Sequence, residues 1–557
     1  MARENYHERV TPFRAALVLA LLSCFVSCGG GDGGARDGRI AARVRVSVDA
    51  SAPGRPISGR LFGANALWID GGQGLVRRRR LEPDPATVAA VRALGVGLLR
   101  FPGGTQSHRY HFMDGIGRLE DRRPGVDVFS GRTVESDYGL DEFMKVTGEI
   151  GAEPIIVTNR AEGSPQESAA FVAYANARVS DDAPIGKDEN GRDFGTSGDW
   201  ARRRAANGRA EPYGVRLVEI GNETNLERYG ERASDYALAF RAHAEAIRRV
   251  DPDVRLFAPG FLDPAEPGLK DRAAKAGVSW NETIVREAGG LLDGLAIHFY
   301  PAERGDSDGC ARLLAEPARL ERGLAALSSW GKSARGPDLP PLLLAITEYG
   351  TFFRAEGEGF TSENASQLTA LFEAGVVMAA ARAGIEAACL HALLLEAPDD
   401  PRLAGGVHFA MLRREKDGRL ARAPIALVFA ELSAALRGRA LLRTSVPGTV
   451  FHTESGAVAA LDALAAEDAA SGEVRVVLVP RAARGVTEVE IECLGLAVAS
   501  AEAVLVAADS LAATRVEGDD PPVRRGTRAL AVGSEGRVAL RLDAGTFAVV
   551  RLRPRPR

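Results

Sequence analysis

Short apolar segments recur through the middle of the chain, each followed by a loop and a longer stretch with helical periodicity. Their apolar positions run continuously instead of alternating, which is typical of parallel strands buried on both faces. Eight segments between about residues 60 and 435 have this character: 61–65, 97–101, 154–159, 216–223, 255–260, 294–300, 342–348 and 387–393.

The stretches between these segments predict helices. In the stretch 233–250, one apolar face at helical spacing is formed by Tyr236, Phe240, Ala244 and Ile247. Repeated strand–helix units predict an α/β fold, a (β/α)8 TIM barrel over residues 58–438. A doubly wound parallel sheet is the structural alternative.

The pattern changes after residue 440. In the segment 487–493, three glutamates alternate with Val489, Ile491 and Cys493, as in a half-buried antiparallel strand. Further strand-like segments follow, and residues 439–557 predict a C-terminal antiparallel β-sandwich. The alternating residues 44–48 predict another strand, and we expect the segment 43–57 to join this sandwich from the N-terminal side.

The first 28 residues predict a bacterial lipoprotein signal peptide. The apolar run 15–22 follows several arginines and is too short to span a bilayer, which needs about 20 apolar residues. Cys24 and Cys28 each follow a serine in a lipobox-like context, and Cys28 is favoured as the lipidated residue because the glycine-rich segment 29–42 then forms a flexible tether. We expect an exported lipoprotein, anchored to the membrane at the periplasmic face or the cell surface; an ordinary cleaved signal peptide is the alternative.

Composition excludes several classes of function. A net charge of −4 argues against a nucleic-acid partner, because such proteins carry a basic excess, and the arginine run 77–80 is expected to be a solvated surface. The chain has no HExxH, phosphate-loop or dinucleotide motif, so neither a metal nor an organic cofactor is expected. Three cysteines beyond the leader have no metal-ligand spacing and are expected to be buried free thiols, with their pairing left open: Cys310, Cys389 and Cys493.

Polar residues end many of the predicted strands. In a TIM barrel the active site lies at these carboxyl ends, so Glu223 and Glu348 should face each other across the barrel mouth. A retaining glycosidase cleaves its substrate with two carboxyl groups that lie about 5–5.5 Å apart. A single glutamate after a strand is more often a surface residue or a helix cap, and the interpretation rests on the polar residues that accompany the pair at other strand ends: Arg100, Asn159, Asn222, His298 and Tyr300.

Their chemistry suggests separate roles. Arg100 would lower the pKa of Glu348, Tyr300 would donate a hydrogen bond to it, and Asn222 would hold a sugar hydroxyl. His298 is either a core histidine or a site residue, and the sequence leaves both open. Phe352 could form part of a sugar-stacking wall, whereas core packing is favoured for Phe353.

These motifs resemble the α-L-arabinofuranosidases of glycoside hydrolase family 51, over about residues 57–555. The similar stretches are 99–104 (LRFPGG), 140–159, 206–223, 293–300 and 346–348. The resemblance implies a barrel followed by a β-domain, with Glu223 as acid/base and Glu348 as nucleophile. Arg100, Asn222, His298 and Tyr300 are implied as their partners.

Three positions depart from the family pattern. Leu67 stands where the family has a sugar-binding glutamate, Thr105 where it has asparagine, and Phe352 where it has tryptophan. A site that reads a sugar by hydrogen bonds discriminates sharply, so the sugar accepted can differ. Thr105, Phe352 and Asn159 are nevertheless counted among the candidate substrate-binding residues.

The sequence therefore predicts a retaining glycoside hydrolase that acts on side chains of polysaccharides or oligosaccharides, with an exo-acting α-L-arabinofuranosidase favoured. Its partners would be the carbohydrate substrate and, through the lipid anchor, a membrane; an oligomer is compatible with the family. One alternative is a glycosidase or endo-glycanase of the same clan with another sugar specificity. Another is a non-catalytic, glycan-binding surface lipoprotein.

Overall fold

The computed structural model describes residues 39–226, 230–301, 307–353, 361–397, 409–453 and 456–555. The predicted signal peptide, with Cys24 and Cys28, lies outside the described residues. Strand β1 (Ile40–Asp49) takes in the last residues of the predicted tether.

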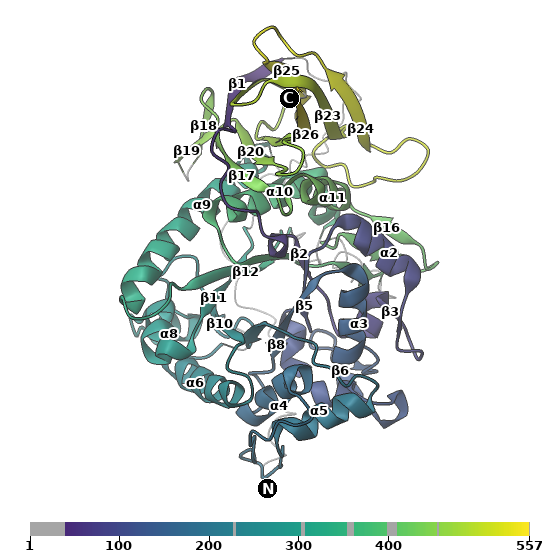
Figure 1. Cartoon of the computed structure of the whole chain (residues 1–557), viewed down its shortest axis with the longest axis vertical. Helices are drawn as coiled ribbons and strands as arrows, with labels where there is room; N and C mark the ends of the chain where they lie inside the picture. The colour runs from purple at the N-terminus through teal and green to yellow at the C-terminus, as the bar shows by residue number, and fades with distance from the viewer. Residues whose placement is uncertain are drawn as a thin grey trace, which may run out of the picture.

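Eight parallel strands close into a barrel, so the predicted TIM barrel is confirmed and the doubly wound alternative is excluded (Figure 1). The barrel closes where β13 pairs with β2, with Cys389 opposite Gly63. Each strand overlaps one of the eight predicted segments, and β8 and β12 each extend one residue beyond theirs: β2 (Gly63–Asn65), β5 (Leu98–Phe101), β8 (Glu153–Thr158), β9 (Leu217–Ile220), β10 (Arg255–Gly260), β11 (Gly294–Phe299), β12 (Leu343–Tyr349) and β13 (Ala387–Leu390).

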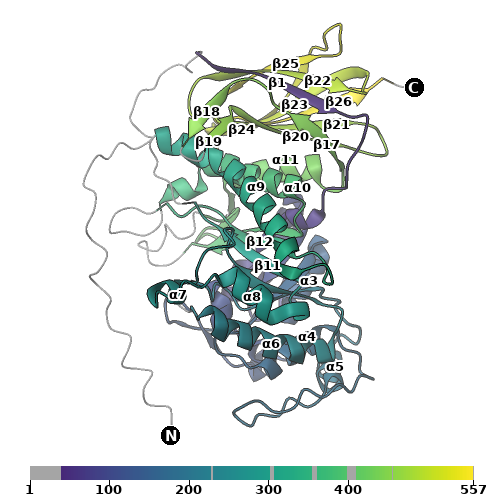
Figure 2. The ribbon, with the colours of Figure 1, turned by 90° about the vertical axis from the view of Figure 1, so that its left-hand side faces the viewer.

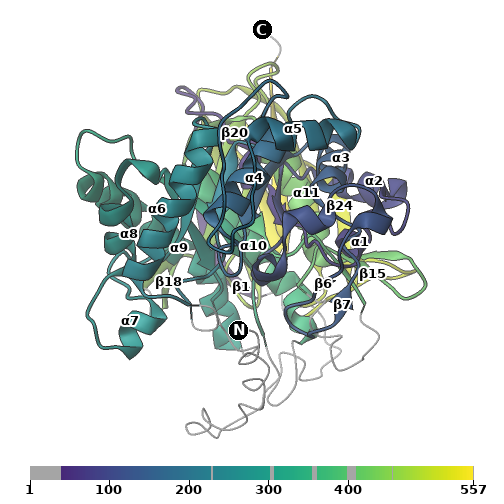
Figure 3. The ribbon, with the colours of Figure 1, turned by 90° about the horizontal axis from the view of Figure 1, so that it is seen from below.

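Helices surround the barrel (Figure 1), and Figure 3 shows helices on the side of the barrel that lies opposite the C-terminal strands. In α6 the predicted apolar face is fully buried. Asp84 caps the first turn of α2 by accepting a hydrogen bond from the Thr87 amide, and Gly95 ends that helix in the left-handed conformation. The helices are α1 (Asp70–Gly74), α2 (Pro85–Leu94), α3 (Leu140–Ile150), α4 (Pro165–Asn176), α5 (Ser197–Ala206), α6 (Ala233–Val250), α7 (Leu269–Ala273), α8 (Trp280–Ala288), α9 (Ser307–Arg335), α10 (Gln367–Ala383) and α11 (Pro424–Leu436).

The C-terminal strands form a sandwich beside the barrel, next to the helices α10 and α11 (Figures 1 and 2). Strand β1 crosses over from the N-terminal side, pairing parallel with β22 and antiparallel with β17. Val46, Ile491 and Leu478, from three of the strands, meet in one apolar core. Together with β1, eight further strands form the nine-stranded sheet that builds the sandwich: β17 (Ala440–Ser445), β20 (Leu461–Glu467), β21 (Val474–Pro480), β22 (Val486–Leu494), β23 (Val498–Ala508), β24 (Val523–Leu530), β25 (Val538–Asp543) and β26 (Phe547–Pro554).

Barrel and sandwich share a continuous core. Helices α10 and α11 lie between them (Figure 2), and Leu464, Val477 and Val549 of the sandwich belong to the same buried cluster as the barrel helices. Gln367, at the start of α10, donates a hydrogen bond to the Gly545 carbonyl at 2.8 Å. The two parts are thus built as one unit, which fixes the sandwich relative to the strand ends.

Short strands pair within the loops that connect the larger elements. The arginine run 77–80 lies in one of them and is exposed, as expected for a solvated surface. The pairs are β3 (Val76–Arg77) with β4 (Glu82–Pro83), β6 (Gly125–Val126) with β7 (Thr133–Val134), and β18 (Val450–Thr453) with β19 (Gly456–Ala459); β14 (Leu394–Glu396), β15 (Leu412–Arg414) and β16 (Leu420–Arg422) form a three-stranded sheet.

Two expectations about the chain's chemistry can be compared with the structure. Cys310 and Cys389 are buried free thiols, and Cys493 is a free thiol that is only partly buried. Among the described residues, none of the helices has the length and apolar character needed to cross a membrane.

Candidate active site

The guanidinium of Arg100, at the end of β5, is the centre of a buried network at the barrel mouth. It donates hydrogen bonds of 2.8 Å to four side chains on or next to three barrel strands: Asn65, Glu219, Asn222 and Glu348. Arg100 is completely buried, so this charge is held by its two carboxylate partners. Breaking such a buried pair costs about 3–5 kcal/mol, and the network therefore fixes the positions of its members.

Glu348, on β12, is held as an ionised carboxylate. Its Oε1 accepts the hydrogen bond from Arg100 and its Oε2 accepts one from the Tyr300 hydroxyl at 2.7 Å. Burial raises the pKa of the Glu348 carboxyl, but the charges of His298 and Arg100 and the bond from Tyr300 outweigh it, so the net pKa lies well below its usual range. Burial and the charge of Glu348 raise the pKa of Tyr300, which therefore stays a hydrogen-bond donor.

Gly104 brings the backbone against this carboxylate. A Cβ at this position would lie 2.3 Å from Glu348 Oε1, so only glycine leaves room for the side chain. The last glycine of the motif 99–104 thus has a direct steric reason at the site.

Glu223 follows β9 and is less buried than Glu348, with 27% of its side chain exposed against 6%. Its Oε1 lies 2.8 Å from His298 Nδ1. Its backbone adopts φ +48°, in the left-handed region, a conformation that costs about 1–3 kcal/mol for non-glycine residues and concentrates at functional sites.

His298 bridges the two carboxyl groups. Besides its bond to Glu223, its Nδ1 is 3.6 Å from Glu348 Oε2, and its Nε2 lies 3.2 Å from the Thr347 hydroxyl. Burial lowers the pKa of His298, but Glu348 and Glu223 raise it by more, so its net pKa lies above the usual value. Of the two interpretations of this histidine, its position favours the site residue.

The two glutamates are close enough for double displacement. One oxygen of Glu223, one oxygen of Glu348 and a ring nitrogen of His298 all lie within 4.8 Å of one another. Retaining glycosidases hold their carboxyl groups about 5–5.5 Å apart, and inverting enzymes hold them farther apart to admit a water. The arrangement can therefore protonate a leaving oxygen on one side and attack the anomeric carbon on the other.

Aromatic rings form a wall beside Glu348. Phe352 stacks on Tyr300 with ring centroids 4.2 Å apart and meets Phe409 edge to face at 5.9 Å. Phe409 in turn stacks on His391, whose Nδ1 is 3.9 Å from Glu348 Oε2. Phe353 is buried instead, as favoured from the sequence.

Other predicted residues lie around this centre. The Nδ2 of Asn222 is buried and has no hydrogen-bond partner within the protein, whereas its Oδ1 accepts from Arg100. Asn159 uses its amide group on the backbone of Tyr110 and Glu162. Thr105 begins a 3₁₀ turn, Thr105–Arg109, next to Gly104 and is partly exposed.

Several site residues were not predicted. Asn65 ends the first barrel strand and His391 follows the last one, so both carried the same strand-end signal as the predicted residues. Glu219 lies inside β9, where a charged residue in an apolar run is itself a signal. Leu67, which replaces the expected sugar-binding carboxylate, lies against the cluster of Ala392, Leu395 and Ala410, together with Phe409.

Glu223, His298 and Glu348 could also be considered as metal ligands. Both oxygens of Glu348 already accept hydrogen bonds, and the Arg100 cation lies 2.8 Å from one of them. A second cation there would meet that charge at close range. This charge argues against a metal ion at the cluster, and the expectation that no metal or organic cofactor is needed stays a prediction.

The sequence itself matches a known domain. Residues 90–281 fit the model of the alpha-L-arabinofuranosidase 1 domain. Over these residues the chain is similar to α-L-arabinofuranosidases. The matched region contains Arg100, Asn222 and Glu223, and Glu348 lies beyond it.

Curated proteins and solved structures are also similar to this chain. An intracellular exo-alpha-(1->5)-L-arabinofuranosidase from Streptomyces lividans is 29% identical over 223 residues, which are 39% of this chain and 30% of that protein. The chain therefore spans less than half the length of this relative. A family 51 alpha-L-arabinofuranosidase from Bifidobacterium longum (TM-score 0.74) and one from Xanthomonas axonopodis pv. citri (TM-score 0.72) are each 21% identical, and the match covers 92% of this chain and 100% of each of theirs. At this identity the likeness to the solved structures concerns the fold alone.

Proposed function

We propose that this α-L-arabinofuranosidase-like protein is a retaining glycoside hydrolase, with an exo-acting α-L-arabinofuranosidase favoured. The observation that carries the proposal is the pair of strand-end carboxyl groups, Glu223 and Glu348, within 4.8 Å and bridged by His298. A glycan-binding protein has no need of two opposed carboxyl groups in this geometry.

The two glutamates would act in sequence. Ionised Glu348 attacks the anomeric carbon while Glu223 gives its proton to the leaving oxygen, and a glycosyl–enzyme ester forms. Glu223, now ionised, takes a proton from a water that attacks the same carbon, and Glu348 is released as carboxylate. Arg100 and Tyr300 stabilise Glu348 in its ionised form at both ends of the cycle.

Sugar recognition would rest on a few groups. The buried Asn222 Nδ2 has a free donor for a sugar hydroxyl, and losing a contact made by a buried polar group costs about 1–3 kcal/mol. Phe352 offers a stacking surface next to Tyr300. Apolar Leu67 supplies no hydrogen bond where the family has a carboxylate, and this supports the alternative of another sugar specificity in the same reaction.

A panel of aryl glycosides tests the proposal, with Glu348→Ala and Glu223→Ala beside the unchanged protein. We expect release of the aryl alcohol from one sugar, α-L-arabinofuranoside first, with loss of activity in Glu348→Ala. Glu223→Ala should keep more activity on good leaving groups, which need less protonation; general acid catalysis is worth about 10²–10⁴-fold. Inactivity on every aryl sugar and on polysaccharides would favour the glycan-binding alternative.

We further propose that the protein is exported and lipid-anchored through Cys28. The support is in the sequence: a basic, apolar leader, a cysteine after a small residue and a glycine-rich segment behind it. Fractionation of the producing cells, with Cys28→Ala and Cys24→Ala compared, tests this proposal. Membrane retention that is lost only in Cys28→Ala is expected, and unchanged retention in both variants would overturn it.

A further inference from the structure

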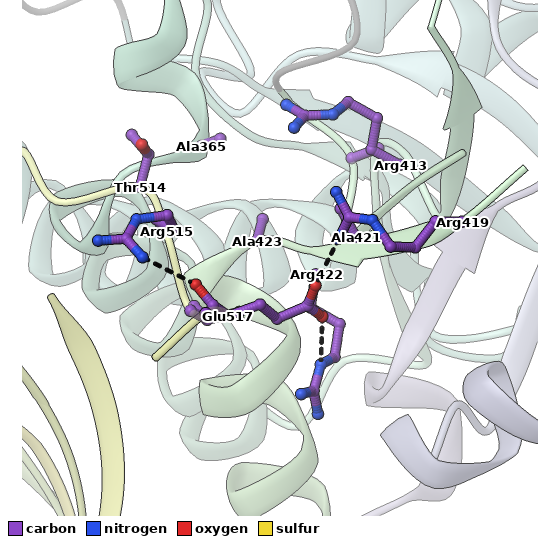
Figure 4. Close-up of a pocket in the computed structure, with 12 residues that line it drawn as sticks. Ala365, Arg413, Arg419, Ala421, Arg422, Ala423, Thr514, Arg515 and Glu517 are labelled. Atoms are coloured by element: carbon purple, nitrogen blue, oxygen red, sulfur yellow. Dashed lines mark hydrogen bonds and ion pairs between the residues drawn. The ribbon is translucent and has the colours of Figure 1, made fainter. Parts of the chain in front are cut away.

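A cavity lies at the junction of barrel and sandwich, and neither Glu223 nor Glu348 lines it. Its volume is about 610 Å³, a size suited to a small-molecule ligand. One side is the hairpin of β15 and β16, and the other is the loop 514–518 of the sandwich (Figure 4). The small side chains of Ala365, Ala410, Ala421 and Ala423 leave the space open.

Arginines dominate the charged lining of this cavity. Figure 4 shows Arg419, Arg422 and Arg515 in contact with Glu517, the one carboxylate among the described residues of the lining, and Arg413 apart from it. Arg419 and Arg422 share that carboxylate, at 2.9 and 3.1 Å. The lining therefore carries a clear excess of positive charge in a chain whose net charge is −4.

The remaining arginines do not remove this excess. Arg515 donates to the backbone carbonyls of Glu517 and Asp520, which are uncharged acceptors. Arg413 pairs with Glu415 at the start of the hairpin turn. Guanidinium groups match carboxylate and phosphate oxygens in shape as well as charge.

The cavity has a framework of ordered backbone. Ala410 follows Phe409, whose carbonyl accepts a hydrogen bond from Ala392, and the Met411 amide bonds back to the Ala392 carbonyl. On the other side, Ala365 follows Asn364, whose side chain bonds to the Phe353 backbone. Both walls are thus tied to the segments that carry the aromatic wall of the active site.

We propose that this cavity is a binding site for a small anion that presents carboxylate or phosphate oxygens. No aromatic ring is among the described residues that line it, so charge and hydrogen bonds, not ring stacking, select the ligand. Glu517 competes with the ligand for Arg419 and Arg422, and binding shifts these two arginines from Glu517 to the ligand.

Calorimetric titration of the purified protein with inorganic phosphate, citrate and galacturonate tests the proposal. Arg422→Gln and Arg419→Gln should each weaken binding about tenfold, the loss of one charge-assisted bond. Glu517→Gln should tighten binding by a similar factor, because two guanidinium groups lose their internal partner. Affinity should fall as salt is added.

The control is Arg118→Gln, which removes an exposed arginine that also pairs with carboxylates and should leave binding unchanged. Preference for phosphate or for galacturonate identifies the source of the anion. Titration of Glu348→Ala separates this site from the catalytic one, since binding here should persist in that variant. Absence of binding by all three anions to both the unchanged protein and Glu517→Gln overturns the proposal. So does an affinity of Arg419→Gln and Arg422→Gln that equals the affinity of the unchanged protein.

Discussion

Arg100 Nη1 donates a hydrogen bond to Glu348 Oε1 at 2.8 Å, from a side chain that has no exposed surface. The same guanidinium binds Glu219 through Nε and Asn222 through Nη2. One cation therefore both holds the proposed nucleophile ionised and aligns the residue that precedes the proposed acid/base.

Replacing Arg100 should change both pH dependence and stability. The depressed pKa of Glu348 keeps it ionised at mildly acidic pH, and activity falls only as pH drops through that pKa. Arg100→Met removes a stabilising charge, so the acidic limb of kcat/KM should move to higher pH. Because two carboxylates then lose their buried partner, the free energy of unfolding should fall by about 3–5 kcal/mol.

Arg100→Lys is the matched variant, since it retains the charge but cannot make four fork-like bonds. It should shift the acidic limb less than Arg100→Met. Identical pH profiles for the unchanged protein and Arg100→Met would contradict this role.

Tyr300→Phe should slow the reaction with little effect on folding. The ring that stacks on Phe352 is kept, and only the hydroxyl that donates to Glu348 Oε2 is lost. A hydrogen bond to a charged group contributes about 1.5–3 kcal/mol, so kcat/KM should fall by about 10- to 100-fold. Tyr349→Phe is the control, because the Tyr349 hydroxyl has no hydrogen-bond partner within the protein; a similar loss in both variants would argue against a specific role for Tyr300.

Gly104→Ala should displace the nucleophile. The added Cβ would lie 2.3 Å from Glu348 Oε1, so the carboxylate must move away from Arg100 or from Tyr300. We expect kcat to fall by about 100-fold, since a displacement near 1 Å has effects of that size. Gly148→Ala, where the new Cβ meets nothing within 4 Å, should keep full activity and stabilise α3 by up to about 1 kcal/mol.

Part of the site could be predicted from the sequence, because the order of the barrel strands determines which residues meet at the barrel mouth. Parallel barrel strands bring their carboxyl ends together, so residues as distant as Arg100 and Glu348 could be placed at one mouth from strand order alone. The eight strands could be predicted because each is a short, continuous apolar run, and such a run can be recognised in the sequence without knowing how the strands pack.

Contacts that depend on packing could not be predicted. Phe352 follows β12 and Tyr300 follows β11, so their stacking depends on how two neighbouring strand ends pack, which no local pattern encodes. Likewise the approach of Gly104 to Glu348, and the role of Glu219 as a second counter-charge, follow from side-chain positions inside the closed barrel.

The titration of His111 should make the stability of the folded protein depend on pH. Hydrogen bonds that His111 donates to Glu162 and Glu167 raise the pKa of His111 to about 10, against the opposing effect of burial. Because the folded pKa lies above the unfolded value of about 6.5, this contribution is complete below pH 6.5 and is lost as pH rises through 10. The Tm of His111→Gln should therefore lie below that of the unchanged protein at pH 6 and approach it at high pH.

The control for this titration is His452→Gln, at an exposed position on β18. Its Tm should follow that of the unchanged protein at every pH. A constant difference in Tm between His111→Gln and the unchanged protein, independent of pH, would show that the ion pairs do not contribute as described.

Trapping of the covalent intermediate tests the central claim most directly. A 2-fluoro-substituted aryl glycoside of the accepted sugar slows hydrolysis of the glycosyl–enzyme ester, so the ester can be located by mass spectrometry of the digested protein. We predict one added fluoroglycosyl group on the peptide that contains Glu348, and none in Glu348→Ala. Turnover with inversion of configuration, or a label on any other residue, would contradict the account.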